Sequence, residues 1–289
     1  MVIVSRCDMK KRRVRLKKKF KKILLLSIIA ICIGVMAYNV IGFVRWNIDR
    51  NQLLDEIKEI EEIVDPVEVE DTEEVELINP PEEQVSDYWY YMKLPFTQVN
   101  LKELKQMNKD TVGFISVAGT NINYPVVQTK DNDYYLNRSF KKQKNDAGWV
   151  FMDYRNNPNF IDSNTVIYGH GRLDTTMFGS LKNILNTSWV NNKDNYVVRY
   201  STEDENLLFQ VFAVYTIQAE SYYIETSFSN DTEYKTWLDT MIKRSKYDFK
   251  TTVNENDTIL TLSTCKEYSG GKERVVMHAK LIKKDKRIE

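Results

Sequence analysis

The longest hydrophobic segment of the chain is an uncharged run near its N-terminus. Ile23 to Val44 reads ILLLSIIAICIGVMAYNVIGFV, twenty-two residues without a charge. An α-helix of this length would span about 33 Å at about 1.5 Å per residue, which matches a bilayer core of about 30 Å. We therefore predict a membrane-spanning helix. A cleaved signal peptide is the alternative, but the run is long for one and no clear A-x-A-like cleavage site follows it.

The pattern changes twice after this run. Asn47 to Ile63 has apolar residues at a loose helical spacing, which predicts a stalk that continues the membrane helix. Asp65 to Gln84 is acidic and contains three prolines, which is typical of an extended linker. We therefore divide the chain into a basic tail (1–22), an anchor (23–44), a stalk and acidic linker (45–86) and a folded catalytic domain (87–289).

The folded domain is predicted to be mainly β. Asn100 to Met107 reads as a short helix with Asn100 as its N-cap and Glu103 three residues later. Eight runs rich in β-branched and aromatic residues follow, separated by turn signals: Val112–Val117, Ile122–Gln128, Gly148–Met152, Thr165–Tyr168, Tyr196–Tyr200, Leu207–Gln218, Thr258–Thr264 and Arg274–Ile282. Helical pieces are expected at Asp133–Asn137, Thr176–Leu185 and Thr232–Lys246, the last capped by Asp231. Many strands with few helices favour a closed β-barrel or a sandwich over a doubly wound sheet.

Charge is balanced overall but unevenly distributed. The chain has 41 basic and 41 acidic residues, yet Arg6 to Lys22 holds eleven Lys/Arg and one acidic residue. This cluster directly precedes the apolar run, so the positive-inside bias predicts a cytoplasmic N-terminus and an extracellular domain after Arg45. Beside a membrane span the expected partner of a polybasic segment is an anionic headgroup, and nucleic acid is not expected.

Cys265 is the first candidate for chemistry. The chain has three cysteines, and Cys7 and Cys32 lie before or inside the predicted anchor. Cys265 would then be alone outside the cell, at the end of a predicted strand and without a disulfide partner. A buried structural thiol is the alternative, but an unpaired thiol in an oxidising compartment favours a reactive role.

His170 and Arg274 are the candidate partners of this thiol. His170 ends the strand-like run Val166–Tyr168 between two glycines, so if its strand lies parallel to that of Cys265 the two side chains meet. An imidazole can protonate a leaving amine, and a guanidinium at Arg274 could hold an oxyanion. His278 lies mid-strand, four residues from Arg274, and is a geometric rival that is more simply explained as a buried, satisfied histidine. The pattern predicts no metal site and no cofactor, because it has no C-x-x-C, H-x-x-x-H or phosphate-binding loop.

These residues resemble a known family. Thr261 to Cys265 reads TLSTC, which is similar to the T-L-x-T-C signature of sortases, the cysteine transpeptidases of the Gram-positive cell surface. Thr165–His170 and Arg274–Val276 resemble the His and Arg segments of that family in the same order. Ser263 in the S-T-C form, the segment Asn121–Gln128 and the helical insertion before the cysteine strand resemble class B.

The resemblance implies a fold, a reaction and a set of site residues. It implies an eight-stranded sortase barrel that cleaves a sorting motif of secreted proteins, forms a thioacyl enzyme and passes the acyl group to an amine of peptidoglycan or its lipid-linked precursor. It also implies roles for six residues: Cys265 as nucleophile, His170 as general acid/base, Arg274 as oxyanion or substrate holder, and Ser263, Tyr223 and Ile224 as lining of the substrate groove.

Two other functions stay open from the sequence. An L,D-transpeptidase also uses a cysteine on wall peptides, but it pairs that cysteine with a nearby histidine, and here His170 and Cys265 are ninety-five positions apart. A non-catalytic anchored binding module would have the same barrel with an inert thiol. The reactivity of Cys265 distinguishes these alternatives.

Overall fold

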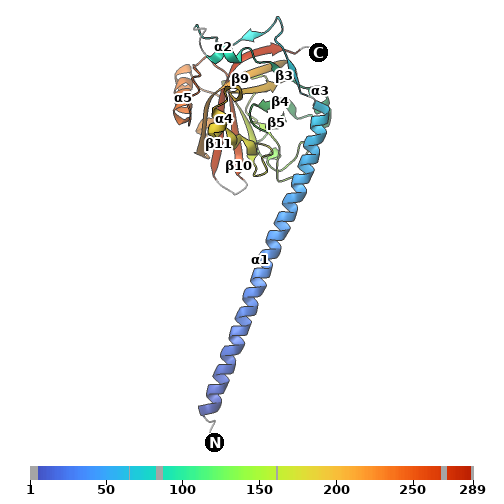
Figure 1. The fold of residues 1–289 in the computed structure, drawn as a ribbon, viewed down its shortest axis with the longest axis vertical. Helices are drawn as coiled ribbons and strands as arrows, with labels where there is room; N and C mark the ends of the chain where they lie inside the picture. The colour runs from blue at the N-terminus through green and yellow to red at the C-terminus, as the bar shows by residue number, and fades with distance from the viewer. Residues whose placement is uncertain (1–5, 65, 83–86, 161, 268–271, 288–289) are drawn as a thin grey trace. The chain divides into compact units, whose positions relative to one another are not determined.

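The computed structural model describes residues 6–64, 66–82, 87–160, 162–267 and 272–287, and of residues 6–16 and 265–267 it describes the backbone only. The chain divides into two compact units, residues 1–52 and 53–289. Figure 1 shows the ribbon of both units. One helix, α1 (Arg6–Val64), contributes residues to each of them.

The first unit consists of the N-terminal part of α1. Across the predicted membrane segment the side chains are exposed, for example Ile23 at 62% and Phe43 at 65%. Within the described residues one helix is long and apolar enough to cross a membrane, with a mean hydropathy of 2.5 in its most apolar window. Exposed apolar side chains on every face are what a bilayer would cover.

The second unit is built around a closed barrel of eight strands. They are β4 (Thr111–Val117), β5 (Asn123–Val127), β6 (Phe151–Met152), β7 (Asn164–Gly171), β8 (Val197–Ser201), β9 (Glu205–Gln218), β10 (Ile259–Glu267) and β11 (Glu273–Lys286). Their order is β10-β7-β6-β5-β4-β8-β9-β11, and a further pairing of β10 with β11 closes the ring. The β10–β7 and β5–β6 pairs are parallel and the others antiparallel. The eight strands predicted from the sequence are thus confirmed, and the barrel form decides against a sandwich.

Short helices connect the strands. They are α2 (Asp87–Tyr91), α3 (Leu101–Met107), α4 (Thr187–Val190) and α5 (Asp231–Arg244), with 3-10 turns η1 (Tyr134–Leu136), η2 (Gly179–Leu185), η3 (Lys193–Asn195) and η4 (Tyr222–Ile224). The Asn100 cap of α3 is confirmed, since its side chain accepts the Glu103 N–H. The expected Asp231 cap of α5 is wrong: Asn230 accepts the Glu233 N–H instead, and Asp231 is the first helical residue.

Three short strands were not predicted. β1 (Val67–Val69) pairs with β3 (Phe96–Gln98), and β2 (Glu76–Leu77) pairs with the end of β11. Two of them lie in the acidic segment that we expected to be an extended linker, and the compact unit begins at Leu53 instead of near residue 87. β1 and β2 consist of two or three residues with mostly exposed side chains and carry no period-2 pattern, so the sequence contains no signal for these two strands.

Two hydrophobic clusters stabilise the second unit. The larger fills the barrel and includes Leu53 and Ile60 from the end of α1. The smaller lies between α5 and the sheet (Figure 1). Trp237 and Met241 of α5 are fully buried in it. Tyr234, Trp237, Leu238 and Met241 of α5 are buried, whereas Ile242 is 42% exposed.

Candidate active site

The parallel pair of β10 and β7 brings two of the predicted site residues together. Thr264 of β10 has Gly169 of β7 as its Cα partner. Cys265 and His170 each follow this pair by one residue, at the C-terminal ends of neighbouring strands. The expectation that these strands lie side by side and parallel is therefore confirmed. The side chain of Cys265 lies outside the described residues.

The antiparallel pair of β10 and β11 brings in the third. Ser263 has Val276 as its partner, and Arg274 lies two residues before Val276 on the same strand. The Val275 N–H donates to Thr264 Oγ1 at 3.0 Å, which fixes the strands together just before the cysteine. Cys265 thus belongs to the middle strand of three, with His170 on one neighbour and Arg274 on the other.

The imidazole of His170 is held by a backbone carbonyl. Its Nε2 lies 2.7 Å from the carbonyl oxygen of Leu136, which can only accept. Nε2 is therefore the protonated nitrogen and Nδ1 is the one that can take up a proton. Gly148 makes room for this contact: its φ is +62°, and a Cβ there would lie 2.6 Å from the Tyr135 carbonyl and 3.0 Å from His170 Cδ2.

Arg274 lies at the start of β11. Arg274 is half-buried, and its Nη1 donates to the carbonyl of Glu273 at 3.0 Å. Its Cα partner on the other side is Ile217 of β9. This pairing with β9 fixes the backbone of Arg274.

His278 is a buried structural residue. Its Nε2 lies 2.7 Å from the Tyr215 hydroxyl and its Nδ1 lies 2.8 Å from Thr261 Oγ1. Thr261 donates onward to Asn164 Oδ1 at 2.6 Å, and Asn164 Nδ2 donates to the carbonyl of Glu225 at 2.8 Å. Burial lowers the pKa of His278 to about 3, so its ring is neutral at pH 7. Both nitrogens are satisfied, which supports the structural interpretation made from the sequence.

The three predicted groove residues also lie together. The Tyr223 hydroxyl and Ser263 Oγ are 3.0 Å apart, and both residues are buried. Ile224 is the next residue along η4, and its carbonyl accepts a hydrogen bond from Arg155 Nη2 at 2.8 Å. The segment between β9 and α5 is therefore joined to β10, two residues before Cys265.

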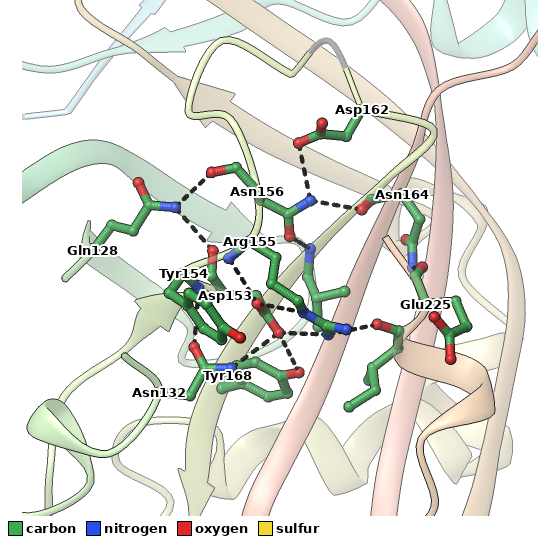
Figure 2. A network of polar contacts seen from close by, with 12 residues as sticks. Gln128, Asn132, Asp153, Tyr154, Arg155, Asn156, Asp162, Asn164, Tyr168 and Glu225 are labelled. Carbon is green, nitrogen blue, oxygen red and sulfur yellow. Dashed lines mark hydrogen bonds and ion pairs between the residues drawn. The ribbon is translucent and has the colours of Figure 1, made fainter. Parts of the chain in front are cut away.

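Sequence reasoning missed the polar residues that follow β6. Asp153 is fully buried and is bonded by Arg155, Tyr168 and Asn132 (Figure 2). The signal in the sequence was an aspartate directly after the apolar strand residues Phe151 and Met152, with an arginine two positions on. That spacing gives no hint of the distant partners.

Comparison with known proteins agrees with this geometry. A family model described as the sortase domain matches residues 115–282, more than half of the chain. The chain therefore belongs to the sortase family.

Its similar proteins share one class within that family. Sortase B of Listeria monocytogenes is 39% identical over 187 residues, covering 64% of this chain and 74% of that protein. Sortase B from Bacillus anthracis, in complex with AAEK1, gives a TM-score of 0.65 at 36% identity and covers 83% of this chain and 99% of that one. A substrate complex of Staphylococcus aureus sortase B gives 0.59 at 37% identity, covering 63% and 84%. These similarities confirm the class B resemblance and a cysteine transpeptidase activity.

Proposed function

We propose that Cys265 is the nucleophile of this transpeptidase, with His170 as its general acid/base and Arg274 as the holder of the oxyanion. The observation that supports the proposal is the strand order, because β10, which carries Cys265, pairs with β7, which carries His170, and with β11, which carries Arg274. Strand ends hold side chains on rigid backbone, which a reaction that needs accurate positioning requires.

His170 has the hydrogen-bond arrangement that the acid/base role needs. With Nε2–H held by the Leu136 carbonyl, Nδ1 takes the proton of the Cys265 thiol as the thiolate attacks the scissile carbonyl. The same Nδ1–H then protonates the leaving amine, and the thioacyl bond remains. An amine of the wall peptide next gives its proton to Nδ1 and attacks the thioester, which releases the thiol.

Arg274 supports the same steps from the other side. Its guanidinium is charged at every pH of interest, so it cannot exchange protons, but it can donate hydrogen bonds to the tetrahedral oxyanion. Ser263, Tyr223 and Ile224 would line the groove that binds the sorting motif. Their mutual contacts and their position next to the end of β10 favour this role.

The partners and the location follow from the family and from the charge pattern. Sortases act on sorting-motif proteins and on peptidoglycan, and we infer a lipid-linked precursor or the wall peptide itself as the acceptor. The apolar helix anchors the enzyme, and the basic residues before it favour an N-terminus inside and residues 53–289 outside.

The test is peptide cleavage by the full chain in detergent. A library of sorting-motif pentapeptides is incubated with the enzyme, and both products and the thioacyl enzyme are identified by mass. Cys265→Ala and His170→Ala should fall to background, while Cys32→Ala should keep wild-type turnover. Arg274→Lys keeps the charge but loses the planar fork, so kcat/KM should fall about 100-fold. Full activity of Cys265→Ala would remove the proposed nucleophile, and unchanged kcat/KM in Arg274→Lys would remove Arg274 from the mechanism.

A further inference from the structure

A buried carboxylate next to β6 collects hydrogen bonds from three separate parts of the chain. Asp153 is fully buried, and Arg155 binds it in a bidentate manner, with Nε 2.9 Å from Oδ1 and Nη2 2.8 Å from Oδ2. The Tyr168 hydroxyl and Asn132 Nδ2 donate to Oδ2 at 2.9 and 3.0 Å. Figure 2 shows these donors converging on the one carboxylate.

Two of these donors belong to segments that hold His170. Tyr168 is two residues before His170 on β7. Asn132 begins the segment that leads to Leu136, whose carbonyl binds His170 Nε2, and its Oδ1 also accepts the Tyr154 N–H at 3.0 Å. Asp153 is therefore bonded to the strand that carries the histidine and to the loop that orients it.

The third donor connects the carboxylate to the predicted groove. Arg155 Nη2 donates to Asp153 and also to the carbonyl of Ile224 at 2.8 Å. Tyr223, next to Ile224, contacts Ser263. The guanidinium is thus a bridge between a fully buried carboxylate and the backbone of the η4 segment.

The charges of this pair are stable. Burial would raise the pKa of Asp153, but hydrogen bonds from Arg155 and Tyr168 outweigh it and hold the pKa below the ordinary value. The hydrogen bond to Asp153 raises the pKa of Arg155. Two parallel hydrogen bonds between a guanidinium and a carboxylate allow little variation in their relative orientation, so the Arg155–Asp153 pair can fix the position of the Ile224 carbonyl.

We propose that Arg155, held by Asp153, is a positioning residue that fixes the Ile224 backbone and so shapes the groove for the sorting motif. The inference rests on the proposed groove role of Tyr223 and Ile224. Because the described hydrogen bonds of the Arg155 side chain go to Asp153 and to the carbonyl of Ile224 in the predicted groove, Arg155 should govern peptide binding more than the chemical steps.

The test compares Arg155→Lys with Arg199→Lys in the full chain in detergent. A lysine cannot bind Asp153 and the Ile224 carbonyl in one planar fork, so KM for the best-cleaved library peptide should rise about tenfold with kcat within about twofold. Arg199 is a matched control, because its Nε also donates to a backbone carbonyl, that of Pro95, at 2.9 Å. Arg199 lies on β8, which is not a neighbour of β10 in the barrel. Arg199→Lys should leave both constants unchanged. Arg155→Gln loses both bonds and should raise KM at least as much, which keeps the test valid if one variant folds poorly.

A second measurement separates this inference from the proposed function. Amide hydrogen exchange over residues 222–226 should be faster in Arg155→Lys and unchanged in Arg199→Lys. Unchanged exchange in Arg155→Lys would overturn the positioning role. Unchanged KM together with faster exchange would also overturn it, and would show instead that η4 is no part of the groove. A fall in kcat at constant KM would place Arg155 in the chemical steps and contradict the inference as well.

Discussion

The two histidines of the chain have opposite environments on the same barrel. His170 is half-buried at a strand end, and one of its nitrogens is bound to a carbonyl. His278 is fully buried, and both of its nitrogens are bonded to hydroxyl groups. With a pKa near 3, the His278 ring is a weak base and carries almost no proton at neutral pH, so it could not supply the proton that a leaving amine needs. The half-buried environment of His170 therefore favours a chemical role, and the fully buried environment of His278 favours a structural one.

His278 should make stability depend on pH. Its pKa is about 3 when folded and about 6.5 when unfolded. Between these two pH values the unfolded chain binds a proton that the folded chain does not. The contribution of His278 to the free energy of unfolding is therefore complete above pH 6.5 and is lost as the pH falls toward 3. From pH 7 to pH 5 the free energy of unfolding should fall by about 2 kcal/mol through this residue. Urea unfolding of the full chain in detergent at both values measures the fall, and His278→Gln should lack this part of it. Parallel profiles for the two proteins would contradict the prediction.

At the scale of elements, much of the fold could be predicted because the signals are local. β10 and β7 are rich in β-branched and apolar residues and have polar residues or glycines at their ends, and α5 has apolar residues at a helical spacing. The adjacency of Cys265 and His170 then needed only one assumption about strand order. The Asp153 network could not be predicted, because it depends on which loops meet across the barrel and not on any local pattern.

The C-terminal end of β11 binds residues of the acidic segment, which its own sequence does not predict. β11 continues beyond its pairing with β10 into a charged run that is still paired with β9, and Lys283 there is fully buried. Its Nζ donates to Asp71 at 2.5 Å and to the carbonyls of Met92 and Leu94 at 2.9 Å each. The Asp285 carboxylate, two residues on, accepts from Thr72. This run therefore fixes the acidic segment that the sequence suggested was a linker.

Lys283 should be more important for stability than the other lysines of this run. Lys283→Met leaves two buried carbonyls and Asp71 without their donor, so the free energy of unfolding should fall by about 2–3 kcal/mol. Lys286→Met is the matched control, because the Lys286 ion pair with Glu74 is exposed and contributes little. Limited proteolysis should also cut residues 66–82 faster in Lys283→Met. Equal stability of the two variants would show that the acidic segment is held by strand pairing alone.

For the whole molecule, function depends on which side of the membrane residues 53–289 occupy. The net charge of zero conceals a strongly basic N-terminus and an acidic region after the apolar run. Lys and Arg resist translocation more than Asp and Glu do, so this asymmetry favours one orientation. A wall-directed transpeptidase can act only if its barrel is outside the cell. The charge pattern and the proposed reaction therefore favour the same orientation.

The native cysteines allow this orientation to be tested. Cys7 precedes the apolar run, and Ser221 is an exposed residue of the second unit. Two single-cysteine proteins are compared in intact cells: one keeps Cys7 alone, and the other carries Ser221→Cys with the native cysteines replaced by alanine. A membrane-impermeant maleimide should label the Ser221→Cys protein at once and the Cys7 protein only after lysis, because a bilayer separates the two sites. Labelling of Cys7 in intact cells would reverse the assigned orientation and would leave the proposed transpeptidase without access to the wall.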